Sequence, residues 1–315
     1  MNKTYTLTQK LLGLAELGRP VEWSKSLLNM FLAALMAYYI YNAVVSPFVF
    51  IAGFISVAFL WSGLYALNDY TDWKIDLVHE TKKNRPIPSG KVTPKQGFIF
   101  SIVLIIASFI IAVILGSVLL GICLGAMLVN QLLYTMKPYR LKTRKVFDII
   151  SGSMINPFFR YMSGIVIFVS FYRLVTYPMP ILPILFVIGI QLSGYTLYRL
   201  FSKKHDKKVK MKSTVAMFPE KTVKIFAYSV MGVAILSYIG LLLNGLTYSI
   251  KWLGFLPPQY IWTIVIVLAV VLVQPSLRGA ILNPQKADMK SSYRLLYGMN
   301  IAFVLANLII FIFFR

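Results

Sequence analysis

The sequence predicts an all-α protein that crosses a membrane several times. Hydrophobic residues make up 58% of the 315 residues, charged residues only 13%, and the mean hydropathy is +0.73. Soluble domains carry about 25% charged residues, so this composition is typical of polytopic membrane proteins. Apolar segments of about twenty residues, the length that crosses roughly 30 Å of hydrocarbon as a helix, recur along the whole chain.

Nine such segments follow one another and predict nine transmembrane helices. Polar connections separate most of them, whereas only Gly116 and Ser117 divide the third segment from the fourth. The segments are residues 22–45, 48–68, 97–116, 118–136, 146–170, 180–201, 223–243, 259–275 and 295–314.

The basic residues are distributed unevenly between alternate connections. One set holds 26 Lys and Arg, whereas the other connections hold only Arg173 and Lys251. Because basic loops remain on the cytoplasmic side, we expect an integral protein of the plasma (inner) membrane with its N-terminus and basic loops in the cytoplasm and its C-terminus outside. An odd number of helices agrees with ends on opposite sides. The basic set comprises residues 1–25, 71–95, 137–145, 202–222 and 276–294.

The net charge of +22 raises the question of a nucleic-acid partner. The basic residues lie in short connections between apolar segments, so membrane topology explains them and we expect a lipid bilayer but no nucleic acid as partner. Cys123 is the only cysteine, which excludes an intramolecular disulfide. We interpret it as a small apolar side chain.

The stretch NDYTDWKID, residues 68–76, concentrates the scarce acids. The chain has only ten Asp and Glu, and Asp69, Asp72, Asp76 and Glu80 lie within twelve positions. Asn68, Asp72 and Asp76 are spaced four residues apart, so on a helix they share one face. Oxygen ligands on one face suit Mg²⁺, which keeps several waters and is completed by substrate phosphate oxygens. The alternative is a solvated helix end with incidental acids.

The connection that follows, HETKKNRPIPSGKVT, adds bases in a predicted turn. Pro86, Pro88 and Gly90 are expected to stiffen this turn. Bases fixed beside acids that hold a cation form a site for a multiply charged anion such as diphosphate. The alternative is a basic loop that only sets topology. The bases are Lys82, Lys83, Arg85 and Lys91.

These motifs resemble the UbiA superfamily of intramembrane prenyltransferases. The signature N-D-x-x-D-x-x-x-D occupies residues 68–76, NRPIPSG follows at 84–90, and YTMKPYRLKTRKVFD at 134–148 is similar to the segment after the family's fourth helix. The resemblance spans nearly the whole chain. It implies one domain over residues 1–315, with a cytoplasmic segment at 1–21 and nine helices in two related four-helix halves around a central cavity. It also implies that Mg²⁺ and an isoprenyl diphosphate bind at the cytoplasmic mouth.

The second family signature, D-x-x-x-D after the sixth helix, is incomplete. The stretch YRLFSKKHDKKVKMKSTVAMF, residues 198–218, aligns through its Lys-Ser-Thr, which places Ser202 at the first aspartate and Asp206 at the second. Asp206 is expected to bind a second Mg²⁺ weakly, or lysines such as Lys203 replace that ion. The alternative is that Asp206 only pairs with neighbouring lysines.

A second resemblance is to the branch that transfers phosphoribose to a polyprenyl phosphate, the decaprenyl-phosphate phosphoribosyltransferases. RPVEWSK at residues 19–25 and HETKKNRPI at 79–87 resemble that branch, whereas PIPSG and KPYRLK favour prenyl transfer. We therefore expect Mg²⁺-dependent transfer of an isoprenyl group to a lipophilic or aromatic acceptor. Phosphoribosyl transfer remains the alternative.

The expected chemistry is electrostatic, because no Ser/His/Asp or Cys/His arrangement is visible. Mg²⁺ on Asn68, Asp72 and Asp76, helped by Arg85 and Lys142, would weaken the bond to the leaving diphosphate, and aromatic faces such as that of Tyr134 would stabilise the carbocation. The expected substrate contacts are Arg19, Lys25, Lys82, Tyr134, Arg140, Arg160, Lys203 and Asp206.

Arg160 lies inside the fifth apolar segment, where contact with lipid would be unfavourable. The sequence therefore predicts that Arg160 faces the cavity or pairs with an acid such as Asp148. A transporter is the main non-enzyme alternative, but transporters keep ionisable groups near the middle of the membrane. Here the acids gather at one interface. A relative that binds lipid phosphate without turnover is a further alternative, because of Ser202.

Overall fold

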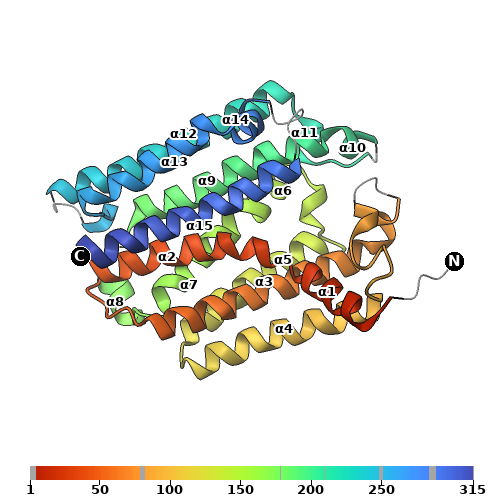
Figure 1. Ribbon diagram of the computed structural model, residues 1–315, viewed down its shortest axis with the longest axis horizontal. Coiled ribbons are helices and arrows are strands. Elements are labelled where there is room, and N and C mark those ends of the chain that lie inside the picture. Colours follow the sequence, from red (N-terminus) through yellow and green to blue (C-terminus); the bar gives the residue numbers. More distant parts are fainter. Residues whose placement is uncertain are drawn as a thin grey trace.

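The computed structural model describes residues 5–78, 82–177, 179–208, 210–247, 251–283 and 289–314. Within these ranges the chain is helical, with one isolated β-bridge between Arg144 and Lys212, so the all-α prediction is confirmed. The long helices run side by side, and the two termini lie at opposite ends of the bundle (Figure 1). Glu80 and His79 lie outside the described residues.

The helices follow the predicted apolar segments closely. Each of the nine segments contains helix. The helices are α1 Leu7–Gly18, α2 Trp23–Tyr39, α3 Pro47–Asp76, α4 Pro94–Ile114, α5 Val118–Thr135, α6 Phe147–Ile150, α7 Asn156–Val166, α8 Phe171–Thr176, α9 Ile181–Arg199, α10 Lys203–Lys208, α11 Thr214–Met217, α12 Glu220–Thr247, α13 Ile261–Val273, α14 Pro275–Leu282 and α15 Met289–Phe314.

Seven helical stretches of the described chain are long and apolar enough to cross a membrane. The predicted segment 22–45 gives only the 17 residues of α2, and the segment 146–170 is interrupted. The structure therefore supports an integral membrane protein but does not confirm the count of nine spanning helices. The division into two related four-helix halves also stays a prediction.

The interruption in segment 146–170 is a π-helical turn, Ser151–Ile155, between α6 and α7. Pro157 has no N–H to donate to the preceding turn. The buried amide of Asn130 on α5 donates to the Ser151 carbonyl at 2.9 Å and to Asn156 Oδ1 at 2.8 Å. Polar groups inside an apolar bundle are thus satisfied where the regular helix is broken.

The boundary between α4 and α5 lies where the sequence placed it. Gly116 has a φ of +62°, which glycine adopts without steric penalty, and the Ser117 hydroxyl accepts a hydrogen bond from the Leu120 N–H at 3.2 Å as an N-cap. The two helices therefore reverse direction within the three residues 115–117.

The bundle is held together by apolar packing between α3 and α4, α9 and α12, and α2 and α7. The contact of α2 with α7 is close, because a Cβ at Gly164 would lie 2.5 Å from the Met30 carbonyl oxygen. Large apolar side chains remain exposed along the outer helices, such as Val113 on α4 and Leu272 on α13. Such a surface is expected for helices that face lipid.

The polar segments gather at one end of the bundle. Helices α1, α10 and α11 and the connection after α3 lie at the N-terminal end, whereas α8 and the C-terminus lie at the other (Figure 1). The basic connections therefore share one end, as the predicted topology requires. Which side of the membrane this end faces stays a prediction.

Candidate active site

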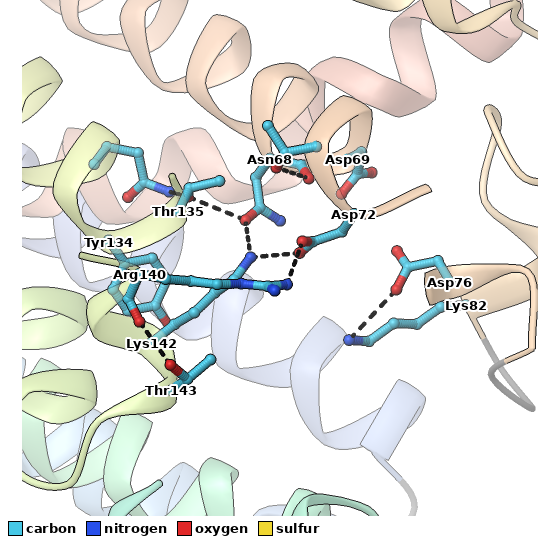
Figure 2. A network of polar contacts seen from close by, with 12 residues as sticks. Asn68, Asp69, Asp72, Asp76, Lys82, Tyr134, Thr135, Arg140, Lys142 and Thr143 are labelled. Atoms are coloured by element: carbon cyan, nitrogen blue, oxygen red, sulfur yellow. Dashed lines mark hydrogen bonds and ion pairs between the residues drawn. The ribbon is translucent and has the colours of Figure 1, made fainter. Parts of the chain in front are cut away.

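The last two turns of α3 form the centre of the polar end. Lys142 donates from Nζ to Asn68 Oδ1 at 3.2 Å and to Asp72 Oδ2 at 2.5 Å, and Arg140 Nη2 donates to Asp72 Oδ1 at 3.1 Å (Figure 2). Thr135 Oγ1 also donates to Asn68 Oδ1 at 3.2 Å. The segment after α5 thus places two bases over the first two predicted metal ligands.

A second group of ion pairs surrounds Asp69, which is only 2% exposed. Its Oδ1 accepts from Arg19 Nη2 at 2.5 Å and from Arg85 Nη1 at 3.0 Å. Arg85 Nη1 also donates to Asp76 Oδ2 at 2.9 Å, and Lys82 Nζ lies 3.8 Å from Asp76 Oδ1. Arg85 therefore joins two carboxylates on α3 to the connection that follows the helix.

This connection is folded, as predicted. Its backbone closes with hydrogen bonds from Ser89 N to Arg85 O at 2.9 Å and from Val92 N to Pro86 O at 3.0 Å, and Gly90 has a φ of +82°. Ile87 and Val92 are buried against Leu17 of α1. The guanidinium of Arg85 is therefore held by a packed turn.

The N-terminal segment contributes a third group. The Arg19 guanidinium lies 5.0 Å from the centroid of the Tyr65 ring. Lys25 Nζ pairs with Glu22 Oε2 at 2.6 Å, and the Tyr65 hydroxyl donates to Glu22 at 3.2 Å. Arg19 and Lys25, both predicted substrate contacts, therefore do lie beside the acid-rich end of α3.

The ion pairs at this end carry a surplus of positive charge. Among the described residues, six bases pair with four acids. Burial lowers the pKa of Lys142 from its usual value despite the attraction of Asp72, and burial likewise lowers the pKa of Lys82 despite Asp76. Partly desolvated cations gain when a multiply charged anion replaces water around them. The bases are Arg19, Lys25, Lys82, Arg85, Arg140 and Lys142.

The oxygen atoms of Asn68 and Asp72 fit a cation. Both accept from Lys142 Nζ, so they already converge on one positively charged group. The C-terminal end of a helix carries partial negative charge, which favours a cation there. Among the described residues no three His, Cys, Asp or Glu lie close enough to hold a metal alone. Mg²⁺ needs only one or two carboxylates besides waters and phosphate oxygens. Asp76, the third predicted ligand, does not share this position, because it faces Arg85 and Lys82.

The segment with the incomplete second signature is held by its own network. Asp206 Oδ2 accepts from Arg199 Nη2 at 2.7 Å and from Ser213 Oγ at 2.6 Å. Among the described residues Asp206 therefore pairs with Arg199 and Ser213 rather than with the neighbouring lysines, and a purely structural role for it stays open as the alternative. Lys203 Nζ donates to the Phe218 carbonyl at 3.1 Å. The roles of Asp206 in binding metal and of Lys203 in binding phosphate stay predictions.

Two further predicted contacts lie deeper in the bundle. The Tyr134 hydroxyl bonds to the Tyr195 hydroxyl at 2.6 Å. Arg160 does not pair with Asp148, so that alternative is wrong: Asp148 accepts from the Thr214 backbone N–H at 3.1 Å and lies 3.7 Å from Arg199. Arg160 instead lies over an indole ring between helices.

The sequence reasoning did not assign roles to Asp69, Glu22 and Arg199. Asp69 is part of the recognised signature. Its contacts with Arg19 and Arg85 depend on how chain segments that are apart in the sequence fold together. Glu22 could have been found as one of only ten acids, placed at the start of an apolar segment. Arg199, four residues after Tyr195 at the end of α9, showed no distinctive spacing.

An apolar cavity of about 290 Å³ lies between α9, α12, α13 and α15. Tyr198 and Leu296 line it, and the ring centroid of Tyr297, the residue after Leu296, lies 5.4 Å from Lys25 Nζ. Most of the wall is aliphatic or aromatic, including Phe186, Ile235 and Phe303. The cavity therefore extends from the polar end into the apolar interior and can take a hydrophobic chain.

Comparisons with known proteins agree with these features. The model of the UbiA prenyltransferase family matches residues 28–304. The protoheme IX farnesyltransferase of Bdellovibrio bacteriovorus is 38% identical over 78 residues, so the match spans 24% of this chain and 27% of that protein. The 4-hydroxybenzoate octaprenyltransferase of Escherichia fergusonii is 26% identical over 250 residues, which are 79% of this chain and 82% of that protein.

Solved structures share the fold. A UbiA homolog from Aeropyrum pernix K1 in its apo form has a TM-score of 0.71 at 16% identity, and the comparison covers 92% of this chain and 98% of that one. A UbiA homolog from Archaeoglobus fulgidus bound to DMAPP and Mg²⁺ has a TM-score of 0.64 at 16% identity, with 93% and 98% covered. At this identity the likeness concerns the fold alone.

Proposed function

Since this chain belongs to the UbiA prenyltransferase family, we propose that it transfers an isoprenyl group from a polyprenyl diphosphate to a lipophilic or aromatic acceptor inside the membrane, with Mg²⁺. One observation carries this proposal: six bases and four acids meet where an apolar cavity begins. A diphosphate needs the charged groups, and its isoprenyl tail needs the apolar cavity.

The family relatives support the same reaction class. The relatives named above are a farnesyltransferase and an octaprenyltransferase, and an archaeal homolog of the same fold was solved with DMAPP and Mg²⁺. The matches to two of the farnesyltransferases span only 24% and 21% of this chain, and 27% and 22% of those proteins.

The proposed site works by holding the leaving diphosphate. Arg85, Arg140 and Lys142 exchange carboxylate oxygens for phosphate oxygens when the substrate binds. Mg²⁺ on Asn68 and Asp72 would add positive charge against the phosphate oxygens. The bond between C1 of the isoprenyl chain and the diphosphate oxygen breaks, C1 bonds to the acceptor, and the acceptor loses a proton.

The chain's aromatic residues shield the reacting carbon. Tyr65 lies beside Arg19 at the start of the apolar interior, and Tyr198 lines the cavity. Aromatic faces stabilise a developing cation, and an apolar wall excludes water that would compete with the acceptor. Tyr134, tied to Tyr195, is proposed for the same role.

Phosphoribosyl transfer to a polyprenyl phosphate is the second candidate. It is favoured by the position of Arg19, Glu22 and Lys25, which belong to the stretch resembling that branch and lie at the polar end. Residues 79–81 of the other resembling stretch lie outside the described residues.

One assay separates the two reactions. The purified protein in detergent is incubated with Mg²⁺ and either geranyl diphosphate with a panel of aromatic and lipid acceptors, or phosphoribosyl diphosphate with a polyprenyl phosphate. We expect diphosphate release and an acceptor heavier by the isoprenyl mass in the first mixture only. Product in the second mixture alone would reject the proposal in favour of the second candidate.

We also propose that the polar end faces the cytoplasm at a plasma (inner) membrane. The support is the gathering of the basic connections at this end, opposite α8, the helix that carries Arg173 (Figure 1).

A further inference from the structure

Arg160 is a charged side chain buried without an acidic partner. It lies in the interior of α7, it is 4% exposed, and its Nε has no hydrogen-bond partner. Its one hydrogen bond runs from Nη1 to Gln191 Oε1 at 3.5 Å. Among the described residues none of the ion pairs includes it. A buried charge in this situation is unfavourable unless something pairs with it.

The described side chains that contact Arg160 are neutral. Its guanidinium lies 3.8 Å from the centroid of the Trp61 ring. Gln191 Nε2 donates to Asn29 Oδ1 at 2.7 Å, which fixes the Gln191 amide with its oxygen toward Arg160. Lys25 is a base at the polar end, and its own charge is paired with Glu22 Oε2 at 2.6 Å. The protein therefore orients the guanidinium through a ring and an amide but leaves its charge uncompensated.

Arg160 also lies on a continuous path from the diphosphate end. The Trp61 ring lies 5.6 Å from the Tyr65 ring, and Tyr65 lies under Arg19. Trp61 precedes Asn68 by seven residues on α3, which is about 10 Å along the helix axis. Arg160 is therefore too deep to hold the same phosphate head group as Asn68 and Asp72.

The two helices that carry Asn29 and Gln191 also line the apolar cavity. Leu28 and Ile190 line the 290 Å³ cavity, and they are the chain neighbours of Asn29 and Gln191. Helices α2 and α9 thus contribute both to the polar group around Arg160 and to the wall of the cavity.

We propose that Arg160, oriented by Trp61 and Gln191, binds an anionic group, a carboxylate or a phosphate, on the acceptor of the isoprenyl group. This inference rests on the proposed function and adds to it that the acceptor is an anion. Pairing of its anionic group with the guanidinium supplies the missing counter-charge and points the rest of the acceptor toward the end of α3.

The test measures equilibrium binding of three probes of similar shape to the full chain in detergent: 4-hydroxybenzoate, phenyl phosphate and the neutral 4-hydroxybenzamide. The outer site is first filled with a non-hydrolysable geranyl diphosphate analogue and Mg²⁺. We expect at least one anion to bind tenfold or more tightly than the amide. The better of the two anions identifies the group as carboxylate or phosphate.

Two variants and a control test the residue itself. Arg160→Gln should abolish the preference for the anion and change the KM for geranyl diphosphate less than threefold, whereas Arg160→Lys should retain part of the preference. Arg173→Gln is the matched control, because Arg173 donates to the Tyr41 carbonyl at the opposite end. A purely structural arginine would lower thermal stability without changing the ratio of anion to amide binding.

The outcomes separate this inference from the proposed function. If unaltered protein binds both anions no more tightly than the amide, the Arg160 subsite is overturned, whether or not the variants fold. If geranyl diphosphate is neither bound nor turned over, the proposed function fails instead, whatever the three probes do.

Discussion

Substitution of Asp72 by asparagine tests whether the negative charge of this side chain is needed at the end of α3. Asp72 accepts from Lys142 at 2.5 Å and from Arg140 at 3.1 Å, and the three side chains are 12–24% exposed. Hydrogen bonds to charged groups contribute about 1.5–3 kcal/mol each and neutral ones about 0.5–1.5 kcal/mol. Asparagine has nearly the same shape, but its NH2 group cannot accept a hydrogen bond. One of the two bonds is therefore lost and the other is weakened, which corresponds to a loss of about 2–4 kcal/mol of stability.

The effect on catalysis should be larger than the effect on stability. Asp72 would lose both its hold on Mg²⁺ and its hold on two bases that face the leaving group. Removal of one preorganised electrostatic contact typically lowers kcat by about 10²–10³. We therefore expect Asp72→Asn to retain folded protein and to lose at least a hundredfold in kcat.

The assay follows diphosphate release at saturating geranyl diphosphate, with thermal unfolding in detergent measured on the same samples. Glu16→Gln is the control, since Glu16 is an exposed acid on α1 whose Oε2 lies 3.2 Å from Lys91 Nζ. Exposed pairs contribute about 0–1 kcal/mol, so the control should match unaltered protein. Turnover of Asp72→Asn within threefold of unaltered protein would refute the assignment.

Three further results are expected. Arg85→Gln removes bonds to Asp69 and Asp76 and should raise the KM for geranyl diphosphate about 10–100-fold, whereas the exposed neighbour Lys83→Gln should not; equal KM values would contradict this. EDTA should abolish turnover and Mg²⁺ should restore it, because the site offers hard oxygen ligands; full activity in EDTA would exclude the metal. In intact cells a membrane-impermeant maleimide should label Trp252→Cys but not Lys204→Cys, with the reverse pattern rejecting the proposed orientation.

The sequence predicted the helical elements well where local signals decided them. The turn at Gly116 and Ser117 depends on a glycine with positive φ and a serine cap, both local features. The break at Ser151–Ile155 was missed, because it depends on Pro157 together with Asn130 of another helix. The nine apolar segments therefore predicted where helices occur but not which segments form one unbroken helix.

The candidate site was predicted in composition and only partly in geometry. The spacing of Asn68, Asp72 and Asp76 correctly indicated a helix that continues past the apolar run to Asp76. In the structure Asp76 faces Arg85, whereas Asp72 faces Lys142. The spacing could not predict this difference, because it depends on how two connections fold back onto α3. Arg160 was recognised as a residue that needs explanation, but its partners Trp61 and Gln191 come from other helices.

The most direct measurement is a structure of the protein with Mg²⁺ and a non-hydrolysable geranyl diphosphate analogue. It should show the diphosphate between Arg85 and Lys142, with the ion on Asn68 and Asp72 and the chain entering the cavity at Tyr198. A head group bound away from the end of α3, or at the end of the bundle that carries α8, would contradict the account.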